Sequence, residues 1–163
     1  MSHIGVYPGS FDPFTIGHLD VLLHAAQMFE SLHVSVLKNN AKSPVFSLKE
    51  RVEMVEGVVR AEKLHNVRVG SFDGLLVDYA ASIGAKYIIR GLRAITDFEY
   101  EFQLDALNRR LNRDIRTVYF MASPEHSFLS SSAVREIGVM GGDITGLVPS
   151  CIQKTIAERL LSQ

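Results

Sequence analysis

The sequence has a single cysteine and no long apolar run. Cys151 stands alone among 163 residues, so the chain cannot form an intrachain disulfide. No apolar run approaches the roughly 20 residues that cross a bilayer, and the N-terminus lacks the pattern of a signal peptide. We therefore expect a cytoplasmic protein with no membrane partner. Because no pattern of histidine and asparagine accompanies Cys151, we expect a small core or half-buried residue rather than a nucleophile.

The sequence also lacks an excess of charge of either sign. Its 17 Lys and Arg residues nearly balance 18 Asp and Glu residues, which gives a net charge of −1. This balance provides no general field for nucleic acid, so we expect no nucleic-acid partner and only local recognition of anions. His126 has no cysteine or histidine companion at ligand spacing, and the other histidines are scattered. We therefore predict no metal site built by the protein.

Strand-like and helix-like segments alternate along the chain without a linker or repeat. Short apolar runs predict strands at 4–7, 32–37, 67–70, 87–89 and 117–121. Helical spacing predicts helices at 17–29, 48–61, 75–83, 97–111, from Ser130 or Ser131 to before Gly141, and at 149–161. This alternation predicts one α/β domain over residues 1–163, with a Rossmann-like, doubly wound, five-stranded parallel sheet in the order 3-2-1-4-5. Ligands of such sheets bind at the carboxyl ends of the strands, where the winding reverses.

The segment 5–18 carries the most information about function. Its apolar strand breaks at Pro8-Gly9, and after a Phe11-Asp12-Pro13 turn, Gly17-His18 opens a helix. Backbone N–H groups and the positive end of a helix dipole therefore face a ligand beside Ser10, which predicts a phosphate site. Gly9 and Gly17 lack a Cβ, so we expect a ligand to approach the backbone closely there. His18 adds a side-chain donor at the same place.

Two further segments bring cations and hydroxyls to the same end of the predicted sheet. Arg90-Gly91-Leu92-Arg93 follows a buried strand, and guanidinium groups suit bidentate binding of phosphate. The alternative is that both arginines only pair with the acidic residues at 97–101. Ser130, Ser131 and Ser132 open a later helix, where one serine caps and the others offer donors. Lys42 lies in a polar loop at the same sheet edge.

These segments resemble a known enzyme family. The segment 5–18 is neither a Walker A loop nor a Gly-x-Gly-x-x-Gly motif. Its residues Thr15-Ile16-Gly17-His18 are similar to the (T/H)xGH signature of the nucleotidylyltransferase superfamily. Together with 7–13, 89–93, 97–101 and 128–132, they resemble the bacterial phosphopantetheine adenylyltransferases over about residues 3–160. The chain departs from this family at Ser10, where threonine is usual, and at His126, where some members have a large aromatic residue.

The resemblance implies a role for each matching position. His18 would be the catalytic residue, donating a hydrogen bond that stabilises the transition state rather than accepting a proton. The implied acceptor site comprises Ser10, Lys42, Leu76 and Arg90. The implied ATP site comprises Ser10, Phe11, His18, Gly91, Leu92, Arg93, Glu101, His126, Ser127, Phe128, Leu129, Ser130, Ser131 and Ser132.

The same resemblance implies a reaction, a cofactor and partners. The reaction would transfer AMP from ATP to 4′-phosphopantetheine, giving dephospho-CoA and pyrophosphate by in-line attack of a phosphate. Mg²⁺ would be held mainly by the phosphates of ATP and by water. The family also implies a homohexamer and CoA as a feedback inhibitor.

Three alternatives compete with this interpretation. The first is a nucleotidylyltransferase with another acceptor, such as nicotinamide mononucleotide or glycerol phosphate, against which the segments 88–93 and 97–101 argue. The second is a fragment of a class I aminoacyl-tRNA synthetase, although the chain is short for tRNA-binding domains and has no Lys-Met-Ser-Lys-like loop. The third is a regulator that binds ATP without turnover, against which the full set of polar residues argues.

Overall fold

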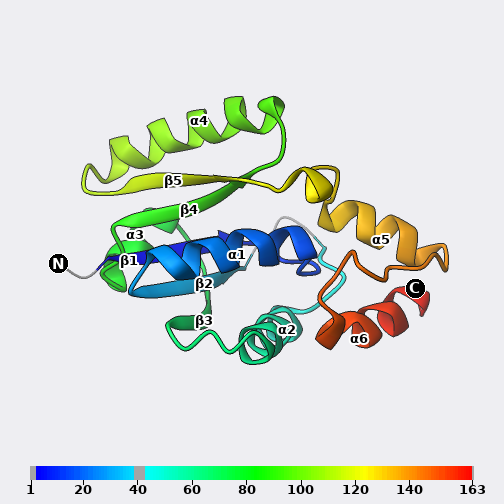
Figure 1. Ribbon diagram of the computed structural model, residues 1–163. Helices are drawn as coiled ribbons and strands as arrows, with labels where there is room; N and C mark the ends of the chain where they lie inside the picture. The colour runs from blue at the N-terminus through cyan, green and yellow to red at the C-terminus, as the bar shows by residue number, and fades with distance from the viewer. Residues whose placement is uncertain (1–2, 39–42, 163) are drawn as a thin grey trace.

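Five parallel strands form one sheet in the order β3-β2-β1-β4-β5 (Figure 1), which confirms the predicted fold class and strand order. The computed structural model describes residues 3–38 and 43–162. Its strands are β1 (Ile4–Gly9), β2 (Ser31–Leu37), β3 (Val67–Phe72), β4 (Tyr87–Leu92) and β5 (Arg116–Met121). The winding of the sheet reverses between β1 and β4, which is where such sheets bind their ligands.

Helices connect successive strands and close the chain. They are α1 (Ile16–Met28), α2 (Leu48–Ala61), α3 (Leu76–Ser82), α4 (Ile95–Leu111), α5 (Ser131–Val139) and α6 (Ser150–Leu161), with a 3₁₀ turn η1 (Pro124–His126) before α5. The predicted capping box opens α2: Glu50 N–H donates to Ser47 Oγ, and Ser47 N–H donates to Glu50 Oε2. Figure 1 shows α5 and α6 packed together at one end of the molecule. Among the described helices, none is both long and apolar enough to span a membrane.

Strands β1 and β4 run further than predicted, to Gly9 and Leu92. β1 pairs with β4 only at Gly5 and Val6, whereas its pairing with β2 continues to Gly9. The two central strands therefore separate toward their carboxyl ends. Pro8 was interpreted from the sequence as the end of the strand. It is tolerated within β1 because β1 is no longer paired with β4 at this position. This separation opens the crevice in which the site lies.

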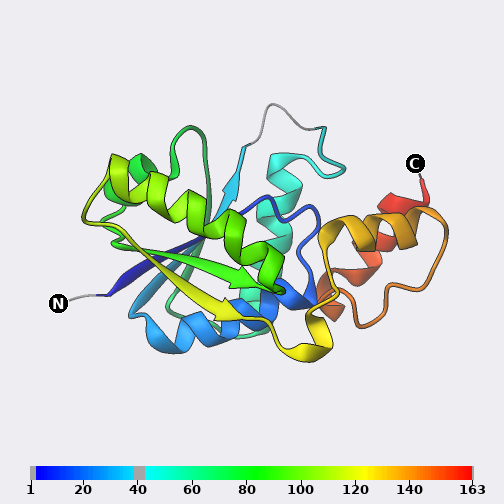
Figure 2. The ribbon, with the colours of Figure 1, turned by 90° about the horizontal axis from the view of Figure 1, so that it is seen from above.

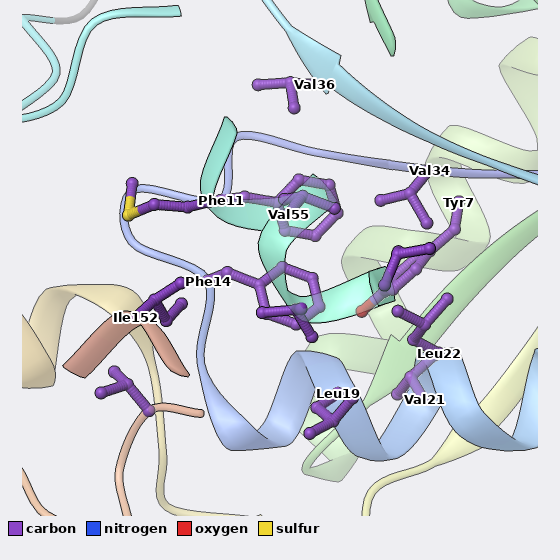
Figure 3. Packing of buried hydrophobic residues seen from close by; sticks show 14 of the residues in the cluster. Tyr7, Phe11, Phe14, Leu19, Val21, Leu22, Val34, Val36, Val55 and Ile152 are labelled. Carbon is purple, nitrogen blue, oxygen red and sulfur yellow. The ribbon is translucent and has the colours of Figure 1, made fainter. Parts of the chain in front are cut away.

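Two apolar clusters cover the two faces of the sheet. Tyr7 and Ile89 belong to the larger cluster, beneath α1, α2, α5 and α6, while their neighbours Val6 and Ile88 belong to the smaller one with α3. This alternation is what a strand with two buried faces requires. Figure 3 shows the ring of Phe11 packed inside the larger cluster, so the turn after β1 is anchored in the core.

Apolar side chains of α4 and the cysteine of α6 are exposed in the structure. The apolar rows of α4 lie largely on the outside, and Phe98, Phe102, Leu107 and Leu111 are each about half exposed or more. Helical spacing alone cannot say what covers such a face. Cys151, expected in or near the core, is exposed because Ile152 and Ile156 occupy the buried face of α6.

Candidate active site

A pocket of about 740 Å³ opens at the carboxyl ends of β1 and β4. It brings together residues of the turn 9–13, which we call the phosphate turn after the predicted phosphate site, with others from the start of α1, the end of β4, α4 and the start of α5. Of the residues singled out in the sequence, the pocket is lined by Ser10, Phe11, His18, Leu76, Arg90, Gly91, Arg93, Glu101, His126, Leu129, Ser130 and Ser131. The topology thus places segments more than 100 residues apart around one cavity.

The turn after β1, residues 9–13, is held from behind by a buried arginine. Arg51 of α2 is 3% exposed, and its guanidinium donates to the carbonyl of Ser10 at 2.7 Å and to the carbonyl of Phe46 at 3.0 Å. Asp12 accepts backbone N–H bonds from Val45 and Phe46 at 3.0 and 2.9 Å. These contacts fix the turn before any ligand arrives. Arg51 was not singled out, because only the folded chain brings it to the turn, and the partners of Asp12 are likewise more than 30 residues away in sequence.

Two glycines at the sheet edge have no room for a Cβ. A Cβ on Gly9 would lie 2.7 Å from the ring of Phe11, and a Cβ on Gly91 would lie 2.9 Å from Cγ2 of Val21. Phe11 itself has φ of +48°, a left-handed conformation that is unusual for a bulky residue. The space on the Cβ side of Gly9 is therefore filled by the ring of Phe11, although both Gly9 and Gly17 line the pocket.

His18 is held in one orientation and one tautomer. Thr15 is the N-cap of α1, and its backbone N–H donates to Nδ1 of His18 at 3.0 Å, while the N–H of His18 donates to Thr15 Oγ1 at 3.3 Å. Because Nδ1 accepts a hydrogen bond, the proton of the neutral ring is on Nε2. The pocket is lined by His18, so the ring can present an N–H donor to it.

The surroundings of His18 keep its ring neutral. Burial, followed by the positive charges of Arg93 and Arg90, lowers the pKa of His18 to about 4. At neutral pH the ring is therefore a hydrogen-bond donor without a charge. Such a group can stabilise a developing negative charge without taking or giving a proton.

Two arginines line the pocket, each paired with a carboxylate of α4. Arg90 forms a two-point ion pair with Glu101, in which Nε donates to Oε2 at 2.8 Å and Nη2 donates to Oε1. Although burial opposes it, this pairing raises the pKa of Arg90. Arg93 pairs with Asp97 at 3.3 Å and donates from Nη1 to the carbonyl of Leu129 at 3.0 Å. The pairing expected under the alternative interpretation is thus present, yet all four side chains also line the pocket.

The serine-rich segment places a second helix N-terminus at the pocket. Ser130 is the N-cap of α5 and accepts from the N–H of Ala133 at 3.1 Å. Ser131 Oγ donates to the carbonyl of Pro13 at 2.8 Å, which ties α5 to the phosphate turn. The N-termini of α1 and α5 therefore meet at one cavity together with two guanidinium groups. An arrangement of this kind can bind phosphate groups and stabilise charge that develops on them.

Some candidate residues do not line the cavity. Leu92 is buried at the end of β4, and Phe128 is 71% exposed. Ser127 and Ser132 also lie outside the lining, and Lys42 lies outside the described residues.

The pocket also has an apolar part of its lining, and most of these residues were not singled out. It is lined by Leu37, Phe72, Leu76, Tyr100 and Leu104. Leu37 and Phe72 are the last residues of β2 and β3. Their position at the carboxyl ends of strands was the available signal, because those ends share one edge of a parallel sheet. The cavity can thus hold a ligand with both a polyanionic and an apolar part.

Comparisons with known proteins agree with this geometry. The sequence model of the family described as Cytidylyltransferase-like matches residues 6–137. A phosphopantetheine adenylyltransferase of Lachnoclostridium phytofermentans is 51% identical over 156 residues, which cover 96% of this chain and 94% of that protein.

Two solved structures share the fold at low sequence identity. A proposed nicotinate-nucleotide adenylyltransferase from Vibrio parahaemolyticus has a TM-score of 0.70 at 18% identity, over 99% of both chains. A bifunctional NMN adenylyltransferase/ADP ribose pyrophosphatase from Francisella tularensis, solved with AMP, has a TM-score of 0.69 at 14% identity. That match covers 99% of this chain and 52% of the other.

Proposed function

The chain belongs to the phosphopantetheine adenylyltransferases, within the cytidylyltransferase-like family, and we propose that the pocket between β1 and β4 is its active site. It is a nucleotidyltransferase that transfers AMP from ATP to 4′-phosphopantetheine, giving dephospho-CoA and pyrophosphate in coenzyme A biosynthesis. The observation that carries this conclusion is 51% identity over 96% of the chain. The site adds a neutral donor, two guanidinium groups and two helix N-termini around one cavity.

The proposed chemistry is an in-line displacement at phosphorus. A phosphate oxygen of phosphopantetheine attacks the α-phosphorus of ATP, and the bond from this phosphorus to the oxygen of pyrophosphate breaks. The nucleophile is already anionic at neutral pH, so no general base is needed. What the site must supply is alignment of two anions and neutralisation of the charge that builds up on the α-phosphate and the leaving group.

His18 would supply the donor that matters most in the transition state. The hydrogen bond from the N–H of Thr15 to Nδ1 fixes the orientation of the ring, so Nε2–H does not have to reorient when charge develops. Arg93 and the start of α5 would bind the phosphates of ATP beside it. Leu92, Ser127, Phe128 and Ser132 do not line the pocket, so their proposed contacts with ATP rest on the resemblance to the family alone.

The acceptor would occupy the side of the pocket between Ser10 and the apolar part of the lining. Arg90, paired with Glu101, would bind its phosphate with Lys42, and Leu76 would contact its arm. The apolar lining from Leu37 and Phe72 suits the hydrocarbon part of this arm. The polar and apolar parts of the lining thus match the two chemical parts of phosphopantetheine.

Mg²⁺ would enter with ATP and be coordinated mainly by phosphate oxygens and water. Within residues 3–38 and 43–162 there is no group of three His, Cys, Asp or Glu side chains that could hold a metal ion. The pocket carboxylates Asp97 and Glu101 are paired with arginines. This fits Mg²⁺, which is usually bound through substrate phosphates rather than in a cage of protein ligands. The ion would neutralise charge on the phosphates.

Assembly, regulation and localisation extend the proposal. We propose that residues 1–163 form one domain that assembles as a cytoplasmic homohexamer and is restrained by CoA. The exposed apolar face of α4 supports assembly, because a face of this kind usually packs against another surface. CoA contains the same phosphopantetheine arm as the acceptor, which supports competition for the pocket. Light scattering after size exclusion would measure the number of subunits.

The test of the function is pyrophosphate release with several acceptors in parallel. MgATP with 4′-phosphopantetheine should release pyrophosphate, whereas MgATP with nicotinamide mononucleotide and CTP with glycerol 3-phosphate should not. Release only with another acceptor would retain nucleotidyl transfer and overturn the proposed substrate. ATP binding with no release in any mixture would favour a regulator.

A further inference from the structure

Asp20 forms a contact between α1 and the segment that follows β5. Its Oδ2 accepts two hydrogen bonds from Ser123, from the backbone N–H at 3.1 Å and from Oγ at 2.9 Å. The side chain of Asp20 is 16% exposed. Although burial opposes it, these two bonds hold the pKa of Asp20 below its ordinary value, so the carboxylate is charged at neutral pH.

The segment held by Asp20 forms one wall of the site. We call residues 123–131 the nucleotide segment, since it contains the pocket residues His126, Leu129, Ser130 and Ser131. Figures 1 and 2 show it crossing beside the start of α1, between β5 and α5. A Cβ on Gly17 would lie 3.9 Å from Cβ of His126, so the middle of the segment rests on the first turn of α1.

This segment has few apolar contacts of its own to fix it. Phe128 is 71% exposed, whereas Leu129 is buried. The short turn η1 has no side-chain cap hydrogen bond from Ser123, whose hydroxyl donates to Asp20 instead. At its far end the segment is fixed by the bonds from Ser131 to Pro13 and from Arg93 to Leu129. Segments with few buried contacts open at low cost, so polar contacts determine their position.

We propose that Asp20 is a positioning residue for adenylyl transfer, which holds the nucleotide segment through Ser123 so that it meets ATP in register with His18. The inference rests on the proposed assignment of this segment to ATP. Asp20 and His18 belong to the same turn of α1. One helix therefore positions both the His18 ring and, through Asp20, the first residue of the nucleotide segment, Ser123. Among the described residues, the polar partners of the Asp20 side chain are Ser123 and His24, and neither lines the pocket.

The test is a set of variants assayed by pyrophosphate release, with each substrate varied in turn. Asp20→Ala should raise KM for ATP about 10–100-fold, as for loss of two hydrogen bonds to a charged group. KM for phosphopantetheine should stay within about twofold of its original value. Asp20→Asn should restore most ATP affinity, because its amide oxygen can accept the same two bonds. Asp105→Ala, which removes an α4 carboxylate of similar exposure that pairs with Arg109, is the matched control and should change neither constant.

Ser123→Ala keeps the proposal testable if Asp20→Ala does not fold. It removes only the hydroxyl bond and should raise KM for ATP about 3–10-fold. An unchanged KM for ATP in these variants, or equal losses of affinity for both substrates, would overturn the positioning role. Direct titration with ATP separates this test from that of the reaction. Unchanged ATP affinity in Asp20→Ala refutes the positioning role, and absence of turnover in the unmodified enzyme refutes the function instead.

Discussion

Replacing His18 by glutamine should remove a specific part of the pH dependence of stability. The pKa of His18 is lowered to about 4 in the folded protein, against about 6.5 in an unfolded chain. Between these values the unfolded state binds more protons than the folded state. The free energy of unfolding therefore falls as the pH drops through this window, and above pH 6.5 the contribution is fully present.

The expected size follows from the two pKa values. Between pH 8 and pH 5, linkage gives a loss of about 2 kcal/mol from this one group. In His18→Gln no such group titrates, so its loss over the same interval should be smaller by about 2 kcal/mol. Any effect of the substitution itself on stability is present at both pH values and cancels in this comparison.

Urea unfolding at pH 8 and pH 5, at constant ionic strength, measures both losses. His65→Gln, which replaces an exposed histidine after α2, is the matched control and should retain the full loss of the unmodified protein. Nuclear magnetic resonance of the His18 ring at pH 6 should show a neutral imidazole with its proton on Nε2. Equal losses in the unmodified protein and in His18→Gln, or a charged ring at pH 6, would refute the reasoning.

Three further predictions concern catalysis and packing. His18→Ala should lower kcat about 10²–10⁴-fold with a much smaller change in ATP affinity, because it removes a transition-state donor; steady-state kinetics would contradict this if kcat were retained. Arg90→Ala should weaken phosphopantetheine binding in a calorimetric titration, and unchanged affinity would contradict its assignment. The same variant should lose about 3 kcal/mol of stability because Glu101, which is 8% exposed, is left without its partner, and Arg90→Ala combined with Glu101→Ala should recover part of this loss. Ile156→Ala should lower the free energy of unfolding by about 2–5 kcal/mol, since Ile156 is fully buried, whereas Thr155→Ala on the exposed side of α6 should change it by less than about 0.5 kcal/mol. Similar losses of stability in Ile156→Ala and Thr155→Ala would refute the prediction about burial on α6.

Much of the fold could be predicted because local signals and topology agree. The alternation of strands and helices predicted the parallel sheet, for which the order 3-2-1-4-5 is a common one, and the capping box at Ser47 and Glu50 predicted the first residue of α2. The (T/H)xGH segment also placed His18 in the first turn of α1 correctly. These features depend on residues close in sequence or on general rules of parallel sheets.

The remainder depended on contacts that local patterns do not contain. Gly9 lines the pocket, but local sequence could not show that the ring of Phe11 fills the space on its Cβ side. Arg51 reads locally as one more polar residue of a helix, yet its guanidinium is buried against the carbonyl of Ser10. The support of the site was therefore much less predictable than its lining.

The bond from Ser131 to the carbonyl of Pro13 joins residues 118 positions apart. During synthesis on a ribosome, the phosphate turn and α1 emerge long before α5 exists. The nascent chain therefore has one half of the cavity without the other until most of its length has been made. An incomplete chain, whether stalled or cut before α5, therefore lacks the second helix N-terminus and one side of the cavity.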